Sequence, residues 1–399
     1  MRVPPGQQLP PNASVVYLDY AATTPVAPEV AARMAECLTR EGTFGNPGSA
    51  GHVYGEAASA SVEAARAQVA AAAGAHAADV VFTSGATEAN NLAIFGTAQY
   101  HRDSGRHIVT ARTEHKSVLD PCRELERRGW SVTYLKPDAD GVLDPARVAG
   151  AVRPETVLVS VMHVNNETGV IQDVGAIAQL CARSGHARMH VDAAQSVGKC
   201  RVDFAEFGID LMSVSAHKVY GPKGAGALLV SRRRGAHLTP ILYGGGQEGS
   251  LRSGTVATHQ AVGMGAAFEL ASAMFGTERE RVAALAERLW RRLREIGGVM
   301  LNGAGAARVP HVLNVSFEGV EGESLLAAVQ PHLAVSTGSA CMSATQEPSY
   351  VLRALGRDDR LAESSLRFSL GRFTSEADID TAATVVTRAV ERLRRIAGT

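Results

Sequence analysis

Between residues 79 and 230 the chain alternates short apolar runs with segments of helical character, and this alternation limits the possible folds more than any other feature. The run at 157–162 is rich in β-branched side chains, as in strands that are buried on both faces. Alternating strands and helices indicate an α/β fold with a mostly parallel central sheet and helices on both faces. We expect its strands at 80–83, 108–111, 132–135, 157–162, 189–191, 209–212 and 226–230.

The composition changes near residue 270, where we place a domain boundary. Residues 256–296 have a helical pattern, and short strands and helices mix after them, as in a smaller α+β domain. A chain of 399 residues is long enough for one large domain and one smaller domain. We therefore predict a mobile Pro-rich arm at 1–14, a large α/β domain at 15–270, whose first residues are candidates for packing on the small domain, and a small domain at 271–399.

Charge and cysteine content exclude several classes of protein. The formal net charge is zero and the charges are interspersed, so no basic stripe indicates binding of nucleic acid or of a membrane surface. The first residues lack the apolar segment of a secretory signal, and no apolar run is long enough to cross a bilayer, which indicates a cytoplasmic location. Five widely spaced cysteines without a C-x-x-C pair argue against a disulfide framework and a metal site.

The segment 213–224 holds two hydroxyls, a histidine and a lysine between an apolar run and a Gly-Pro turn, a pattern typical of a strand that ends at a loop. A lysine beside phosphate-binding groups is what a pyridoxal-phosphate enzyme needs. Its amine forms a Schiff base with the cofactor, and the hydroxyls beside it hold the phosphate. Lys218 is the candidate lysine, and the alternative is an ordinary exposed lysine on a surface turn.

In a parallel sheet, ligands bind beyond the carboxyl ends of the strands. One such end, at 84–88, leads into a helix whose first N–H groups form an anion site, where Ala86 and Thr87 suit a phosphate. The alternative is that Thr87 only caps the helix. Another strand end carries His115, whose imidazole suits stacking on a flat ring or acid–base work. The alternative for His115 is a partly buried, hydrogen-bonded histidine without a catalytic role.

Two further strand ends carry polar side chains. Asn165 and Asn166 precede a glutamate, and such groups are costly to bury unless they bind something, although an Asx turn would also explain them. Asp192 is suited to keep a pyridine nitrogen protonated, which makes the ring an electron sink, and Gln195 to hydrogen-bond the ring oxygen. The alternative for Asp192 is a helix cap.

The expected small domain carries two more candidates. Cys341 lies in a Gly- and Ser-rich stretch, 336–343, where a thiol can deprotonate and reach a bound substrate. The alternative is a small buried side chain, which free cysteines usually are. Arg367 has a two-pronged guanidinium that suits a substrate carboxylate.

These residues and their surroundings match a known family. The chain resembles the cysteine desulfurases, class V members of the fold-type-I pyridoxal-phosphate enzymes, and is most similar to the housekeeping group that supplies sulfur for iron–sulfur clusters. The resemblance extends from about Tyr17 to Ile396. Its motifs are at 17–25, 83–91, 162–169, 190–195, 215–224, 244–255, 339–342 and 347–353.

The resemblance implies the chemical roles of four residues. It makes Lys218 the Schiff-base lysine, His115 the group that stacks on the ring and moves protons, and Asp192 the partner of the pyridine nitrogen. Cys341 attacks the sulfur of the cysteine–cofactor adduct, which gives alanine and an enzyme persulfide. A labile carbon–sulfur bond next to a thiolate nucleophile agrees with this assignment.

The resemblance also implies binding roles. Asn166 and Gln195 contact the ring, and Arg367 together with Asn165 holds the substrate carboxylate. The implied phosphate ligands are Ala86, Thr87, Ser215, His217 and Thr255. Of these, Thr255 comes from the other subunit of a homodimer.

The chain departs from the family pattern at three places, and the last of them, the missing tail, leaves the sulfur acceptor open. Ala216 stands where glycine is usual, Met342 stands where a hydroxyl residue is usual, and the chain ends at Thr399 without the tail of the housekeeping group. A selenocysteine lyase, or a desulfurase dedicated to tRNA or DNA sulfur modification, would share the site and differ in partner and loop. A partner-dependent scaffold is the non-enzyme alternative. The expected partners are L-cysteine, a second copy of the chain and a sulfur acceptor such as an iron–sulfur scaffold or sulfur carrier.

Overall fold

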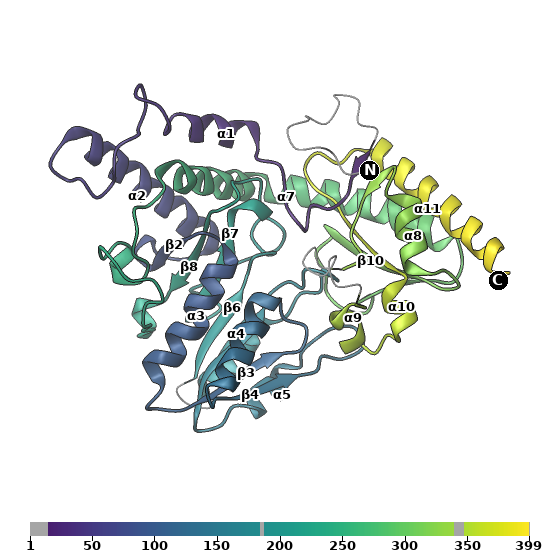
Figure 1. Cartoon of the computed structure of the whole chain (residues 1–399), viewed down its shortest axis with the longest axis horizontal. Coiled ribbons are helices and arrows are strands. Elements are labelled where there is room, and N and C mark those ends of the chain that lie inside the picture. Colours follow the sequence, from purple (N-terminus) through teal and green to yellow (C-terminus); the bar gives the residue numbers. More distant parts are fainter. Residues whose placement is uncertain (1–14, 184–186, 339–346, 399) are drawn as a thin grey trace.

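The computed structural model describes residues 15–183, 187–338 and 347–398. At their centre lies a seven-stranded sheet with the order β2-β8-β7-β6-β5-β3-β4 (Figure 1). Adjacent strands are parallel except at β8, which runs antiparallel to both β2 and β7. The strands are β2 (Val80–Thr83), β3 (His107–Ala111), β4 (Ser131–Leu135), β5 (Thr156–Met162), β6 (Arg188–Asp192), β7 (Leu211–Ser215) and β8 (Gly226–Val230).

The direction of β8 departs from the parallel pattern because its connection is short. Residues 216–225 join β7 to β8. A parallel return needs a crossover of about a dozen residues or more. The chain therefore turns back and places β8 antiparallel to β7, between β7 and β2.

Helices cover both faces of this sheet, as alternating side chains require. On β8, Leu228 packs into one apolar cluster and Leu229 into the other. The Leu228 cluster includes α3 (Ala86–His101) and α4 (Lys116–Arg127). The predicted α/β fold is confirmed. The Leu229 cluster includes α1 (Pro28–Ala35), α2 (Val53–Ala73), α5 (Pro145–Gly150), α6 (Val174–Arg183) and the first part of α7 (Thr258–Arg294).

The Ala-rich helix α2 shows how local sequence sets these elements. Alanine has the highest helix propensity, so a long run of it forms a helix. His52 caps the first turn by accepting a hydrogen bond from the Gly55 N–H. Gly74 ends the helix with a φ of 64°, and a Cβ there would lie 2.7 Å from Asp203 Oδ1. A larger residue at position 74 would therefore disturb this helix end.

The C-terminal part has its own apolar core, and α7 belongs to both cores. Four residues of an apolar stripe on α7, spaced three and four positions apart, are buried in the second core, and Figure 1 shows the helix passing from α2 to this part. The predicted boundary at residue 270 falls inside α7. The buried stripe residues are Val282, Leu285, Leu289 and Leu293. The other elements are β9 (Val299–Leu301), β10 (Val312–Phe317), α8 (Gly322–Val329), β11 (Leu333–Ala334), α9 (Tyr350–Ala354), α10 (Asp359–Glu363), β12 (Ser365–Ser369) and α11 (Glu376–Ala397).

The first described residues contact the C-terminal part. Strand β1 (Val16–Tyr17) pairs in parallel with β11, and Leu18 is buried in the second core. Strand β1 is short because β11 offers only two residues for pairing, and Asp19 instead bridges to Ser369. The arm predicted at 1–14 lies outside the described residues. Across the part of the chain that the structure covers, every helix is too short or too polar to span a membrane.

Candidate active site

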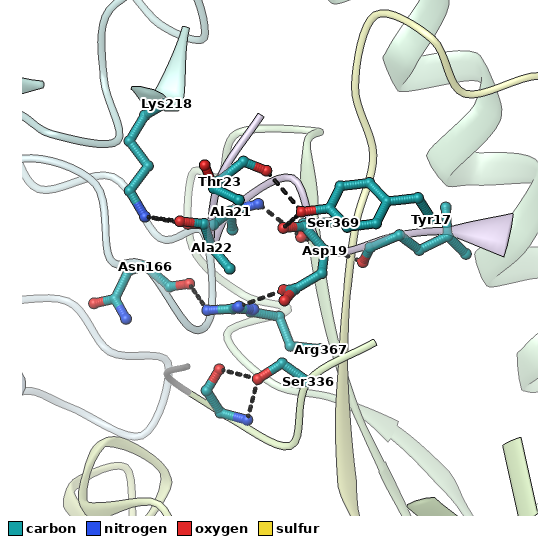
Figure 2. Close-up of polar contacts among 12 residues, drawn as sticks. Tyr17, Asp19, Ala21, Ala22, Thr23, Asn166, Lys218, Ser336, Arg367 and Ser369 are labelled. Atoms are coloured by element: carbon teal, nitrogen blue, oxygen red, sulfur yellow. Dashed lines mark hydrogen bonds and ion pairs between the residues drawn. The ribbon is translucent and has the colours of Figure 1, made fainter. Parts of the chain in front are cut away.

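Lys218 lies just past the end of β7, where the chain turns. Ser215 ends the strand, and a single 3-10 turn, Ala216–Lys218, follows it. The Lys218 Nζ donates hydrogen bonds to the carbonyl oxygens of Ala21 and Ala22, at 2.6 and 2.8 Å (Figure 2). The segment that follows β1 therefore holds the amine at the carboxyl edge of the large sheet.

A cavity of about 420 Å³ lies at this edge, and Lys218 lines it. Its wall comes from the ends of several strands, as expected for a ligand site in a parallel sheet. Residues that are far apart in the sequence therefore meet around one space. The predicted site residues that line the cavity are Ala86, Thr87, His115, Asn166, Asp192, Gln195, Ser215, His217, Lys218 and Arg367.

One region of the wall is suited to bind an anion. Helix α3 begins at Ala86, and its cap is Gly85 with a φ of 148°, so Thr87 stands inside the first turn and is not the cap. The first N–H groups of a helix have no partner within the helix. The Ser215 Oγ is buried and has no hydrogen-bond partner among the described residues. Free helix N–H groups and an unpartnered hydroxyl fit phosphate oxygens.

His217 stands beside this anion-binding region. Its Nδ1 lies 3.1 Å from the Thr23 Oγ1. Burial, assisted by the nearby Lys218 and Lys223 amines, lowers the pKa of His217 to about 4. The ring is therefore neutral at pH 7 and has one N–H to donate.

Asp192 is fixed by its neighbours at the end of β6. Its Oδ2 accepts a hydrogen bond from Asn90 Nδ2 at 2.8 Å, and its Oδ1 accepts one from the Ala194 N–H at 3.0 Å. In the described chain the next element after β6 is β7, so Asp192 caps no helix and that alternative is wrong. A carboxylate held at a strand end is suited to pair with a protonated pyridine nitrogen.

His115 lies at the start of α4 and lines the same cavity. Its Nδ1 accepts a hydrogen bond from the Ser117 N–H at 3.1 Å, which places the proton of the neutral ring on Nε2. Burial lowers the pKa of His115, although Asp192 acts in the opposite direction, so the ring is mostly neutral at pH 7. Asn90 donates to the Ser117 Oγ as well as to Asp192, so one amide connects the surroundings of both groups.

Arg367 enters the cavity wall from β12. Its Nη2 lies 2.7 Å from Asp19 Oδ1, and its Nη1 donates to the Asn166 carbonyl oxygen at 2.9 Å (Figure 2). Its Nε is buried without a partner among the described residues, as is the Asn166 Oδ1. A buried guanidinium with donors left over is suited to bind a carboxylate.

Asn165 is not part of the cavity wall. Its Oδ1 accepts hydrogen bonds from the N–H groups of Glu167 and Thr168, at 2.9 and 3.0 Å. Its Nδ2 donates to the Thr113 carbonyl oxygen. Because the turn uses both ends of the amide, the Asx turn explains this residue and the expected contact with a substrate carboxylate finds no support.

Two other candidates are not brought to Lys218 within the described chain. Thr255 lines a different cavity, together with Arg66 and Glu248. Its predicted contribution across a homodimer stays a prediction. Cys341 lies outside the described residues, so its role as sulfur acceptor also stays a prediction.

Several residues that line the cavity or contact its lining residues were missed at the level of sequence. Glu88 and Lys223 line the cavity, and both stand in segments that the sequence had singled out. Asn90 follows Thr87 by three positions, which places both on one face of a helix, and this spacing could have indicated it. Thr23 and the carbonyl groups beside it gave no comparable signal, because backbone oxygens carry no sequence information.

Comparison with known proteins decides the family. The family model described as Aminotransferase class-V matches residues 16–381. A relative from Azotobacter vinelandii (strain DJ / ATCC BAA-1303), named Cysteine desulfurase IscS, is 55% identical over 96% of this chain and 94% of its own length. The chain belongs to the cysteine desulfurase family. The resemblance to the housekeeping group of this family is thereby confirmed.

Solved structures agree with this assignment. A NifS-like protein superposes with a TM-score of 0.88 at 32% identity, covering 95% of this chain and 100% of that chain. A structure described as SspA in complex with cysteine superposes with a TM-score of 0.80 at 37% identity, covering 90% of this chain and 100% of that chain. This desulfurase is therefore a pyridoxal-phosphate-dependent enzyme with the fold predicted from its sequence.

The residues of the cavity fit pyridoxal phosphate. Lys218 supplies an amine for a covalent linkage, and Asp192 supplies a carboxylate for the ring nitrogen. The buried, unpartnered Ser215 Oγ and Asn166 Oδ1 are polar atoms that a bound cofactor or substrate would satisfy. Within residues 15–183, 187–338 and 347–398, no three His, Cys, Asp or Glu side chains group as metal ligands.

Proposed function

We propose that the cavity at the carboxyl edge of the large sheet is the place where this desulfurase removes sulfur from L-cysteine, with Lys218 as the lysine that bears the cofactor. The observation that carries this proposal is the position of the Lys218 amine. It lines one cavity with the anion-binding turn at Ala86 and the Asp192 carboxylate. An amine, an anion site and a carboxylate are the three groups that the aldehyde, phosphate and ring nitrogen require.

Bound pyridoxal phosphate supplies an electron sink that makes the carbon–sulfur bond of the substrate labile. Asp192 would keep a proton at the ring nitrogen, and Asn166 and Gln195 would contact the ring. Arg367 orients the substrate by binding its carboxylate. The groups that hold the phosphate are Ala86, Thr87, Ser215 and His217.

His115 would stack on the ring and move protons at the substrate. Its Nδ1 accepts from the Ser117 N–H, so the neutral ring offers a hydrogen-bond donor to a substrate at Nε2, and transfer of a proton from His115 requires the imidazolium form. Its lowered pKa makes this imidazole a neutral donor at pH 7, and Asn90 fixes the Ser117 hydroxyl beside it. The His115 ring is thus held in one tautomer by its own backbone turn.

The sulfur leaves as a persulfide on Cys341. The Cys341 thiolate attacks the substrate sulfur, so that a sulfur–sulfur bond forms and the carbon–sulfur bond breaks. The electron pair of the broken bond stays with the substrate carbon, which takes up a proton and leaves as alanine. The two thiol sulfurs remain on the enzyme as Cys341–S–SH, which balances the step without an external oxidant.

The proposal includes two kinds of protein partner. In a homodimer, Thr255 would join the phosphate ligands of the other copy. The persulfide sulfur then passes to an acceptor protein such as an iron–sulfur scaffold or a sulfur carrier. A cytoplasmic location is part of the same proposal, and the four cysteines of the described chain, which are all free thiols, suit a reducing compartment.

Product analysis tests this function. The enzyme is incubated with L-cysteine and a reductant, and alanine and sulfide are quantified beside the Cys341→Ser variant at matched cofactor content. We expect equimolar products from the enzyme and none above background from the variant. Turnover of selenocysteine without turnover of cysteine would identify a selenocysteine lyase instead. Normal sulfide release by Cys341→Ser would overturn the role of Cys341.

A further inference from the structure

Lys199 is a buried lysine next to the Lys218 cavity. Only 8% of it is exposed. In the described chain, its Nζ has one hydrogen-bond partner, the Gln195 Oε1. Glu278, a carboxylate that acts on Lys199 electrostatically, forms its ion pair with Arg372 instead. Burying an ammonium group without a paired carboxylate is costly, so stability alone does not account for this side chain.

The choice of lysine at this position is itself informative. The chain has 40 basic residues, and only five of them are lysines. Unlike arginine, a lysine can give up its proton when it is buried. Burial, assisted by the nearby Lys218, lowers the pKa of Lys199 to about 7. Position 199 therefore holds a hydrogen-bond donor that can gain or lose its positive charge near pH 7.

A chain of hydrogen bonds leads from Lys199 to Lys218. Lys199 donates to the Gln195 Oε1, and the Gln195 Nε2 donates to the Ala21 carbonyl oxygen at 2.8 Å. The same carbonyl oxygen accepts from the Lys218 Nζ at 2.6 Å. Both ends of the Gln195 amide are thus fixed, and Gln195 itself lines the cavity. Donation to its oxygen draws electron density from the amide and strengthens its N–H groups as donors.

We propose that Lys199 is a positioning residue of the cofactor site, which orients and polarises the Gln195 amide and so sets how tightly the linkage between Lys218 and the cofactor holds its proton. The inference rests on the proposed placement of pyridoxal phosphate beside Gln195. A hydrogen bond from Gln195 to the ring oxygen makes that oxygen a weaker acceptor for the proton of the linkage. Lys199 in its protonated form also repels this proton. Both effects have the same sign, so Lys199 lowers the pH at which the linkage loses its proton.

Charged and titratable groups from several elements surround Lys199, so the test must distinguish the effect of Lys199 on the linkage from their effects. In the described chain, Lys199 is the only side chain found to donate to the Gln195 Oε1. An effect that passes through Gln195 can therefore be assigned to Lys199. The titratable and charged groups that act on Lys199, or on which it acts, are Lys218, His217, Cys200, Glu278, His311 and Arg367.

The visible absorption of the bound cofactor reports the proton on its linkage to Lys218, so a pH titration of the holoenzyme provides the test. Lys199→Met keeps the length of the side chain and removes the amine. We expect the titration midpoint to rise by about one pH unit, a tenfold gain in proton affinity. In a Gln195→Leu background, Lys199→Met should add much less, because the two residues act as one unit. Lys136→Met, at an exposed lysine, is the matched control and should not shift the midpoint.

Each other result would overturn the proposal. An unshifted midpoint in Lys199→Met would show that the amine does not act on the cofactor. An equal shift with and without Gln195 would show that it does not act through this amide. If neither Lys199→Met nor Lys199→Gln gives folded protein, the amine has a structural role. A wild-type enzyme without visible absorption would instead refute the proposed placement of the cofactor, on which the inference depends.

Discussion

The Arg367 Nη2 and the Asp19 Oδ1 lie 2.7 Å apart, and this ion pair joins residues 348 positions apart in the sequence. The ion pair connects β12, which carries Arg367, to the segment after β1, which carries Asp19 (Figure 2). The same segment holds the Lys218 amine through the Ala21 and Ala22 carbonyl groups. The proposed substrate-binding residue and the proposed cofactor lysine are therefore positioned by one short piece of chain.

Loss of the Arg367 guanidinium should weaken substrate binding. We expect Arg367→Gln to raise the KM for L-cysteine about 10- to 100-fold, because a charge-assisted hydrogen bond contributes roughly 1.5–3 kcal/mol. Steady-state kinetics and the affinity for the product alanine measure the effect. Arg33→Gln breaks an exposed ion pair with Glu269 and is the matched control, with an unchanged KM. A KM for Arg367→Gln within about twofold of the wild type would refute the assignment.

The ion pair between Glu88 and Arg252 should govern cofactor affinity. Arg252 Nε lies 2.9 Å from Glu88 Oε1, and the other Glu88 oxygen accepts from the Ser84 N–H at 2.7 Å. Burial opposes ionisation, yet hydrogen bonds from Arg252 and Ser84 lower the pKa of Glu88, so a carboxylate lines the cavity near the phosphate turn. Without Arg252 that charge would repel a phosphate dianion.

We therefore expect Arg252→Gln to weaken the binding of pyridoxal phosphate about tenfold or more, and the double variant Glu88→Gln with Arg252→Gln to recover most of the loss. Equilibrium dialysis of the cofactor-free protein measures both. A double variant that binds more weakly than Arg252→Gln alone would show that the pair acts through structure and not through charge.

Buried neutral histidines should make the fold sensitive to acid. His190 lies between two strand hydroxyls, with Nδ1 2.8 Å from Ser160 Oγ and Nε2 3.0 Å from Ser213 Oγ. Burial lowers the pKa of His190 to about 4. The unfolded chain takes up this proton below a pH of about 6.5, whereas the folded protein resists it, so the free energy of unfolding falls as the pH drops from about 6.5 towards 4. Burial also lowers the pKa values of His163, His217 and His311.

Chemical unfolding at a series of pH values measures this loss, for which His190 alone accounts for about 3 kcal/mol at the acid end. His190→Gln keeps groups that can bond both hydroxyls and removes the titrating ring. Its stability should fall less steeply with decreasing pH than that of the wild type. Identical slopes for the two proteins would contradict a neutral, buried His190.

Part of the site was predictable because parallel strands bring their ends to one edge. His115, Asp192 and Lys218 each follow a strand that the sequence marks clearly, so their meeting follows from the fold class. The backbone contacts that hold these side chains in place were not predictable in this way. The Ala21 carbonyl accepts from Lys218 across 197 positions, and a backbone oxygen looks the same in every residue.

Local ambiguity explains the remaining differences. A short polar side chain such as Asn165 can serve a turn or a ligand equally well in sequence, and only the partners of its amide decide between them. Thr87 is a good helix cap by type, but Gly85 reaches a backbone conformation that places the helix start one residue after it. The direction of β8 depended on the length of a connection, which strand patterns do not show.

Locating the covalent attachment of the cofactor tests directly whether Lys218 is the lysine that bears it. Borohydride reduction of the holoenzyme fixes pyridoxal phosphate to its lysine, and peptide mass mapping then identifies that residue. We expect the added mass on Lys218 alone, and its absence from the Lys218→Ala variant. Lys223 also lines the cavity, and Lys199 lies close to Lys218, so the mapping distinguishes among three lysines that are near enough to react with the cofactor. Added mass on Lys223 or Lys199 in the wild-type enzyme would show that Lys218 is not the lysine that bears the cofactor.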